Sequence, residues 1–215
     1  MKQFFLFFVI FSSFELFARQ IEETTFSYWK KPDSKIYYSI PDSIDANTKI
    51  IFIMHGASRT AEKYLNDWLP LAKNRNVVLI APEFSKESYP EYVYLMMGTE
   101  RGKLLKDQSL YLTDSLGLLF DYFKAKLKLS TSTFRLYGHS GGSQFVHRYL
   151  LLSDELRVEK AVMANAGFYT FADDKISYPF GIKNMNVSSE RLEWFLRLKG
   201  GVFLGDADND PKHHS

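Results

Sequence analysis

The chain has 215 residues, which is enough for one sizeable domain and too few to predict two large ones. Hydrophobic residues make up 46% of it and charged residues 24%, a balance that argues against disorder over most of its length. The formal net charge of +2 favours neither nucleic acid nor an anionic membrane as a partner. The absence of cysteine from the sequence excludes disulfides, thiolate metal sites and a cysteine nucleophile.

The N-terminal segment has the pattern of a signal peptide. A short positive region precedes an apolar run over residues 4–14, and the segment ends at the small residue Ala18. The run is shorter than the roughly 20 residues that a membrane-spanning helix needs, and Glu15 follows it. We therefore expect a signal peptide at 1–18, a folded domain at 19–215, a secreted or periplasmic location and no stable membrane anchor after cleavage. A buried first helix is the alternative.

Strands and helices alternate along the rest of the chain. Polar and apolar residues alternate over 24–29 and 35–40, which predicts a hairpin of half-exposed strands. Apolar runs typical of strands buried on both faces follow at 49–54, 77–81, 134–137, 160–164 and 201–204. Helical spacing is found over 61–72, 110–127, 143–152 and 189–198. The alternation predicts an α/β fold with a mostly parallel central sheet, helices on both faces, and reactive groups at the carboxyl ends of the strands.

The strongest local motif is Gly138-His139-Ser140-Gly141-Gly142, between a predicted strand and a predicted helix. It matches G-x-S-x-G, a tight turn that presents a nucleophilic serine. The outer glycines are expected where a Cβ atom would clash with the turn. We expect Ser140 to be the nucleophile and the amide of Gly141, at the start of the helix, to stabilise an oxyanion. A plain glycine turn is the alternative.

A second motif, Met54-His55-Gly56-Ala57, ends an earlier strand. The loop after this strand supplies the other oxyanion donor in such layouts, so we assign the amide of Ala57 to that role. His55 is on the wrong loop for a catalytic base, and we expect it to shape the loop by packing and hydrogen bonding.

Three residues are assigned to substrate binding: His55, His139 and Tyr92. His139 adjoins Ser140 and is interpreted as shaping the pocket. Tyr92 belongs to an aromatic-rich connection over 89–97, which either walls a pocket or is ordinary packing.

An aspartate-rich turn follows the last apolar run, in the sequence from Leu204 to Pro211. The acid of a catalytic triad belongs at the end of such a strand, since the chain order for this layout is serine, acid, histidine. Asp208 is the first choice for the acid and Asp206 the second. A solvated loop or a calcium-like cluster is the alternative.

Together these motifs and Asn165-Ala166-Gly167-Phe168-Tyr169 resemble α/β-hydrolases of the poly(3-hydroxybutyrate) depolymerase and feruloyl esterase group, over about residues 35 to 211. The resemblance implies an exported serine-dependent hydrolase of small-molecule or polymeric carboxylic esters, without metal or organic cofactor. It also implies that Ser140 attacks, that Asp208 orients the base, and that Ala57 and Gly141 form the oxyanion hole.

The sequence departs from this pattern at its end. The group carries its catalytic histidine beyond one more strand, whereas this sequence stops at Ser215, and a parallel crossover alone needs about 10–12 residues. We therefore expect a C-terminally incomplete fold that lacks the last strand, an exposed apolar sheet edge at 202–204, and impaired activity. His213 or His214 is an alternative base, although a tail lacks preorganisation. A non-catalytic binding protein and a serine peptidase of the same fold are the competing functions.

Overall fold

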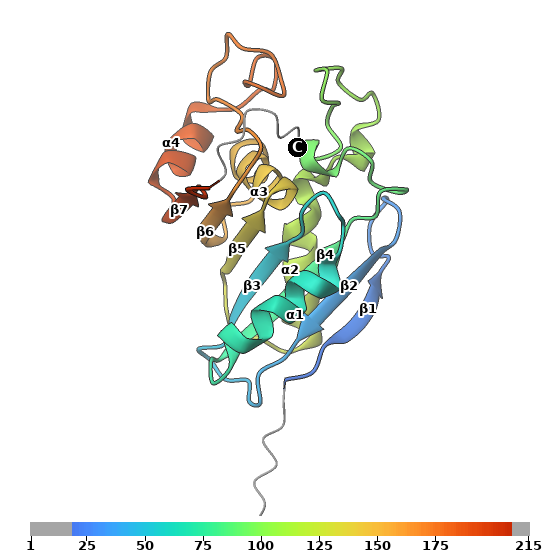
Figure 1. Cartoon of the computed structure of the whole chain (residues 1–215), viewed down its shortest axis with the longest axis vertical. Coiled ribbons are helices and arrows are strands. Elements are labelled where there is room, and N and C mark those ends of the chain that lie inside the picture. Colours follow the sequence, from blue (N-terminus) through green and yellow to red (C-terminus); the bar gives the residue numbers. More distant parts are fainter. Residues whose placement is uncertain (1–18, 208–215) are drawn as a thin grey trace, which may run out of the picture.

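The computed structural model describes residues 19–207; the predicted signal peptide at 1–18 and the residues from Asp208 onward lie outside this range. A seven-stranded sheet with the order β1-β2-β4-β3-β5-β6-β7 forms the centre of these residues (Figure 1). The strands are β1 (Glu22–Phe26), β2 (Ser34–Ser39), β3 (Lys49–Met54), β4 (Val77–Glu83), β5 (Phe134–His139), β6 (Val158–Ala164) and β7 (Gly200–Phe203). The helices are α1 (Ala61–Ala72), α2 (Ser115–Lys126), α3 (Gly141–Leu152) and α4 (Ser189–Arg197), with short 3-10 turns η1 (Tyr92–Tyr94), η2 (Gln108–Leu110) and η3 (Leu112–Asp114).

The sheet is parallel except at its first edge. β1 pairs with β2 and β2 pairs with β4 in antiparallel fashion, and all other neighbours are parallel. The predicted hairpin is confirmed, but the expected half-exposure is wrong for β2. Its residues Ile36, Tyr37 and Tyr38 are buried because the strand lies inside the sheet and packs on both faces.

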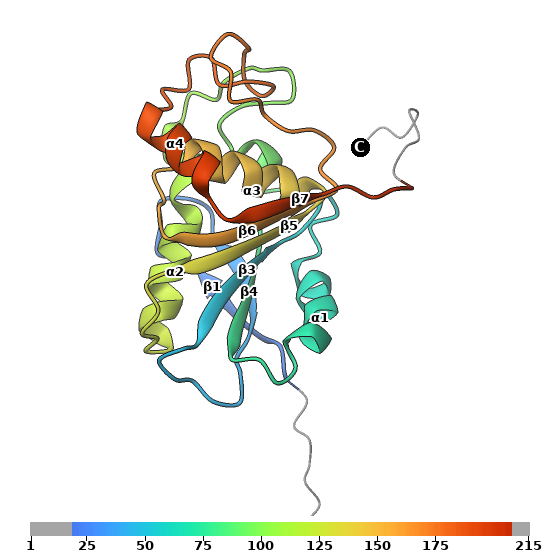
Figure 2. The same ribbon diagram turned by 90° about the vertical axis from the view of Figure 1, so that its left-hand side faces the viewer.

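Helices cover both faces of the sheet, as predicted. Figure 2 shows α1 on one face and α2, α3 and α4 on the other. The smaller core cluster lies under α1 and includes Leu65, whereas the larger one lies under α2 and α3 and includes Phe120 and Phe145. The helix expected from residue 110 begins only at Ser115, because the preceding residues form η2 and η3. In the described part of the chain, no helix is long and apolar enough to cross a membrane.

β7 forms the second edge of the sheet within residues 19–207. Its apolar residues Val202 and Phe203 are 54% and 58% exposed, and the following Leu204 is 74% exposed. The predicted exposed apolar edge is thus confirmed for the described residues.

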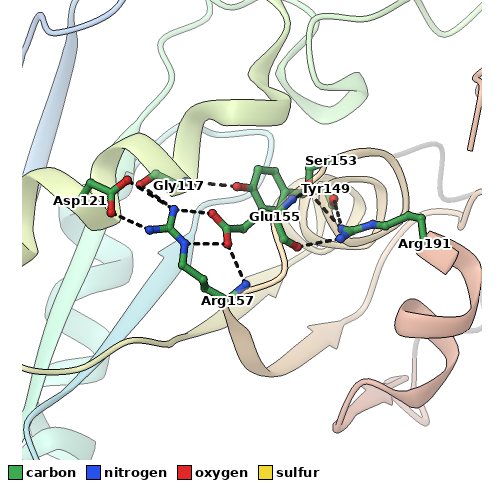
Figure 3. Close-up of polar contacts among 7 residues, drawn as sticks. All are labelled: Gly117, Asp121, Tyr149, Ser153, Glu155, Arg157 and Arg191. Carbon is green, nitrogen blue, oxygen red and sulfur yellow. Dashed lines mark hydrogen bonds and ion pairs between the residues drawn. The ribbon is translucent and has the colours of Figure 1, made fainter. Parts of the chain in front are cut away.

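A polar network fastens the start of β6 to three helices (Figure 3). Arg157 donates to the carboxylate of Glu155 at 2.9 and 2.7 Å and to Asp121 on α2 at 2.6 Å. Arg191 on α4 donates to the carbonyl oxygen of Glu155 at 2.7 Å, and the Tyr149 hydroxyl on α3 accepts from the amide of Gly117 at 3.2 Å. The loop between α3 and β6 is therefore held by charged hydrogen bonds at the end of the sheet opposite Ser140.

Replacing Arg157 by Met should lower the free energy of unfolding by about 2–3 kcal/mol, because the nearly buried carboxylate of Glu155 loses its cation. The matched control is Asp121→Asn, which alters a 58% exposed partner of the same arginine and should cost less than about 1 kcal/mol. Urea unfolding followed by circular dichroism measures both. Equal losses in the two variants would contradict this account of the network.

Candidate active site

Ser140 connects β5 to α3 in a backbone conformation that is strained for a residue with a side chain. Its φ is 55° and its ψ is −122°. The amide of Ser140 donates to the carbonyl oxygen of Ala164 at 2.9 Å, and its own carbonyl accepts from the amides of Ser143 and Gln144 at 2.9 and 3.2 Å. The strained residue is therefore held from β6 on one side and from the first turn of α3 on the other.

Two glycines allow this turn to form. A Cβ atom at position 138 would lie 2.2 Å from the carbonyl oxygen of Gly142, and one at position 142 would lie 2.1 Å from the carbonyl oxygen of Met54. Both obstacles are backbone atoms, which cannot rotate away as a side chain can. The turn thus packs directly against the end of β3. This agrees with the prediction that Cβ atoms at the outer glycines would clash with the tight turn.

The structure brings the two expected oxyanion donors together. A Cβ atom at Gly141 would lie 3.1 Å from the amide nitrogen of Ala57, and one at Gly56 would lie 3.4 Å from the Cβ of Ser140. Ala57 is exposed and Gly141 begins α3. Two backbone amides from different loops therefore meet beside Ser140, at the positive end of a helix dipole.

His55 lies behind this pair of amides. The amide of Phe84 donates to its Nε2 at 3.1 Å, which leaves Nδ1 as the donor to the carbonyl oxygen of Gly56 at 3.0 Å. Burial, assisted by the positive charge of Arg59, lowers the pKa of His55 to about 4. The neutral ring braces the loop after β3 by packing and hydrogen bonding, as expected from the sequence. Because it is fully buried, the geometry does not support its assignment to direct substrate contact.

Tyr92 also differs from its assignment to substrate binding. Its ring is fully buried and stacks on Phe84 and Phe145 at centroid distances of 5.3 and 4.9 Å. Its hydroxyl donates to the carbonyl oxygen of His55 at 3.1 Å. Tyr92 therefore supports the loop after β3 from within the core. The aromatic connection over 89–97 is mainly packing, the alternative that the sequence left open.

Val93, a half-buried neighbour of Tyr92, is a residue of the site that the sequence analysis missed. Its Cγ1 lies 3.0 Å from the place that a Cβ atom at Gly141 would occupy. The residue stands between two buried tyrosines in an apolar run, so no pattern in the sequence distinguished it from core residues.

The other described histidines have different partners. The Nδ1 of His139 lies 2.9 Å from the hydroxyl of Tyr64 on α1, and this half-exposed ring lies beside the turn. The Nε2 of His147 lies 2.7 Å from the carbonyl oxygen of Thr170, and burial lowers its pKa. Among residues 19–207, no histidine forms a hydrogen bond with Ser140.

The carboxyl end of β7 lies at the same end of the sheet as Ser140. His139 is in register with Ala164, and Ala164 is in register with Phe203. The amide of Asn165 donates to the carbonyl oxygen of Phe203 at 2.9 Å. Asp206, the second choice for the acid, follows β7 in the chain and is exposed. Asp208, His213 and His214 lie outside the described residues.

Within the described range, no group of three or more histidine, aspartate or glutamate side chains is arranged to hold a metal ion.

Comparison with solved structures places this arrangement in a family. Poly(aspartic acid) hydrolase-1 from Sphingomonas sp. KT-1 superposes with a TM-score of 0.83 at 33% sequence identity, over 91% of this chain and 75% of that protein. The chain belongs to the α/β-hydrolase superfamily. The serine turn after β5 and the loop after β3 have the places that the resemblance to α/β-hydrolases implied.

Two further α/β-hydrolases share the fold at lower identity. A poly(3-hydroxybutyrate) depolymerase from Bordetella parapertussis has a TM-score of 0.78 at 21% identity, over 91% of this chain and 70% of its own. A fluorophosphonate-binding serine hydrolase from Staphylococcus aureus has a TM-score of 0.57 at 15% identity, over 87% and 79%. No family model matches the sequence. No curated protein matches it either.

A methyl group added at the turn should destabilise the folded chain. Gly142→Ala is expected to lower the free energy of unfolding by about 3 kcal/mol or more, because its Cβ would overlap the carbonyl of Met54. The control is Gly201→Ala, whose Cβ would meet only the ring of the exposed Phe203, and it should cost less than about 1 kcal/mol. Urea unfolding decides, and similar stabilities for the two variants would refute the steric account.

His55 should make the stability depend on pH. Its pKa of about 4 in the folded chain lies below the ordinary 6.5, so the unfolded chain takes up the proton first. The stabilising contribution is complete above pH 6.5 and is lost as pH falls towards 4, by about 3 kcal/mol in total. In His55→Gln the amide oxygen replaces the Nε2 acceptor, and the free energy of unfolding should fall less steeply between pH 6.5 and 4. Urea unfolding measures this, and the titration of His147 is common to both proteins. Parallel curves would contradict the assignment.

Proposed function

We propose that this chain is a serine-dependent carboxylic ester hydrolase that works through an acyl-enzyme. The observation that carries the proposal is the strained Ser140, with a φ of 55°, beside the amides of Ala57 and Gly141. A turn with a purely structural role does not require a strained residue, whereas this strained conformation exposes the side chain of a nucleophile. The 33% identity with poly(aspartic acid) hydrolase-1 supports hydrolysis on this fold.

In the proposed reaction, Ser140 Oγ attacks the acyl carbon of the ester while its proton passes to a histidine. The amides of Ala57 and Gly141 stabilise the negative charge that forms on the carbonyl oxygen. The alcohol leaves with the proton from the histidine, and water then releases the acid from Ser140 by the reverse sequence.

The acid and the base of the triad belong to the proposal. We propose Asp208 as the acid, with Asp206 as the second choice, because β7, which precedes both residues in the sequence, ends at the same carboxyl end of the sheet as Ser140. The sequence has five histidines, and those at 55, 139 and 147 do not bond to Ser140. The proposal therefore draws its base from outside residues 19–207, where this sequence offers His213 and His214.

The substrate is proposed as a small-molecule or polymeric ester, outside the cytoplasm after removal of residues 1–18. Amide hydrolysis is the second candidate, because the relative at 33% identity is named for poly(aspartic acid), a polyamide. Esters and amides share the tetrahedral intermediate, so the same oxyanion site serves both. A non-catalytic protein of this fold is the third outcome.

A fluorophosphonate probe should label the purified chain at Ser140, and p-nitrophenyl butyrate should be hydrolysed. Ser140→Ala should remove labelling and lower turnover by about 10³-fold or more, because the nucleophile is gone. The His213→Ala/His214→Ala variant should keep the fold, and loss of its turnover would assign the base to this pair. Mass spectrometry of the labelled peptide, ester hydrolysis and circular dichroism give the three measurements.

Each result separates the candidates. Labelling and turnover that survive Ser140→Ala would refute the proposal. A folded wild-type chain that neither labels nor hydrolyses would favour a non-catalytic protein. Cleavage of a p-nitroanilide faster than the matched ester would favour the amide substrate. Turnover that survives the double histidine variant would exclude both tail residues as the base.

A further inference from the structure

Arg148 is a buried cation without an ion pair among the described residues. It lies on α3, about two turns beyond Ser140, and its side chain is completely buried. Its guanidinium lies 4.9 Å from the ring centroid of Tyr94 and 4.7 Å from that of Phe168. Burial lowers its pKa. Such a cation is costly to bury unless hydrogen bonds satisfy its donors.

Those hydrogen bonds join two separate loops. Arg148 Nη1 donates to the carbonyl oxygen of Val93 at 2.7 Å, in the loop after β4. Its Nε donates to the hydroxyl oxygen of Thr170 at 3.0 Å, in the loop after β6. The aromatic partners divide in the same way, because Tyr94 belongs to the first loop and Phe168 to the second. One side chain from α3 therefore holds both loops.

The two loops form a cap above the carboxyl ends of the strands (Figure 1). The loop after β4 is green and the loop after β6 is orange in this view, and both rise from the same end of the sheet. They also meet directly, since the hydroxyl of Tyr178 donates to the carbonyl oxygen of Tyr94 at 2.7 Å. Within the loop after β6, Thr170 donates to the carbonyl oxygen of Pro179 at 2.7 Å.

The cap reaches the proposed oxyanion site through Val93. Arg148 holds the carbonyl of Val93, and the Cγ1 of the same residue packs against Gly141. The chain of contacts from the guanidinium to the proposed oxyanion donor thus contains one intermediate residue. A shift of Val93 would alter the space beside the amide that faces the acyl group.

We propose that Arg148 is a positioning residue that fixes Val93 as the acyl-side wall of the Ser140 site and thereby sets which acyl groups fit. The inference rests on the proposed function. The planar guanidinium suits this task because its donors point to both loops at once, whereas an apolar side chain would fill the space without fixing either loop.

Arg191 provides a matched control. It is also a buried arginine that stacks on an aromatic ring, Trp194 at 4.1 Å, and donates to the backbone carbonyl oxygens of Glu155 and Tyr149. These contacts fasten α4 to α3 and to the loop before β6 (Figure 3), and they include neither cap loop. Arg191→Met should therefore reproduce the loss of a buried guanidinium without moving Val93.

The experiment compares p-nitrophenyl esters with acyl chains of two to eight carbons in the wild type, Arg148→Met and Arg191→Met. Arg148→Met should change the octanoate-to-acetate ratio of kcat/KM by about tenfold, the size of effect expected when the fit of one methylene group changes. Val93→Ala should change the ratio in the same direction with Arg148 intact. Arg191→Met should lower the melting temperature and keep the ratio within about twofold of the wild type.

If Arg148→Met does not fold, Thr170→Val replaces it, because it removes one acceptor and preserves the side-chain shape. A ratio that stays at the wild-type value in the folded variant would overturn the proposal. So would an equal change of the ratio in Arg191→Met.

Hydrogen exchange of the free chain supplies a readout that does not depend on turnover. In Arg148→Met, the amides of Leu105 and Phe171, which are hydrogen-bonded within the two loops, should both exchange about tenfold faster than in Arg191→Met. Unchanged exchange in both loops would overturn the positioning role. If the wild type has no esterase activity but both loops exchange faster in Arg148→Met, only the proposed function is rejected.

Discussion

The site depends on the direct contact between the turn at Ser140 and the end of β3. No side chain separates the backbone at Gly142 from the carbonyl of Met54, because a single added carbon would lie 2.1 Å from that oxygen. This closeness brings the amide that follows the turn and the amide of Ala57 into one small region. The parallel pairing of β3 with β5 sets the two strand ends level, and without that register the two loops would not meet.

Arginines reinforce this region in an uncommon way. Arg59 donates to the carbonyl oxygens of Phe84 and Tyr89 and lies 4.6 Å from the ring centroid of Tyr92. Arg148 likewise binds a backbone carbonyl and stacks on aromatic rings, and Arg191 does the same at the opposite end of the sheet. A guanidinium can satisfy several carbonyls of an irregular loop at once, which regular secondary structure does not do for such loops. The loops around Ser140 thus owe their order to cations from neighbouring elements.

Much of the fold and part of the site were predictable from the sequence. The turn at Ser140 was found because glycine, serine and glycine occur at fixed spacing between an apolar run and a helical segment, and local sterics determine such a turn. The amide of Ala57 was placed by the same logic. The fully buried states of β2 and Tyr92 were not predictable, since alternation and aromatic content do not reveal which neighbours will cover a residue.

The positions of Val93 and Arg148 in the structure could not be predicted from local sequence patterns. Val93 becomes important only through its distance from Gly141, 48 positions away in the sequence, and Arg148 only through two loops that meet in space. The charge of Arg148 offered no clue, because arginines in helices are usually solvated. Long-range packing, which is decided by the whole fold, therefore supplied the information that the sequence analysis lacked.

The anchoring of two loops on one helix has a consequence for how such a protein can diversify. The two loops carry exposed apolar residues, with Leu104 at 44%, Phe180 at 51% and Phe171 at 65% exposure, and none of the three bonds to or stacks on the buried guanidinium. Mutations can accumulate at these positions without disturbing the sheet or the serine turn. Selection for a new substrate would therefore act most freely on the rim of the cap, while its internal anchor stays constant. In directed evolution, the rim is the place to randomise and Arg148 the residue to leave alone.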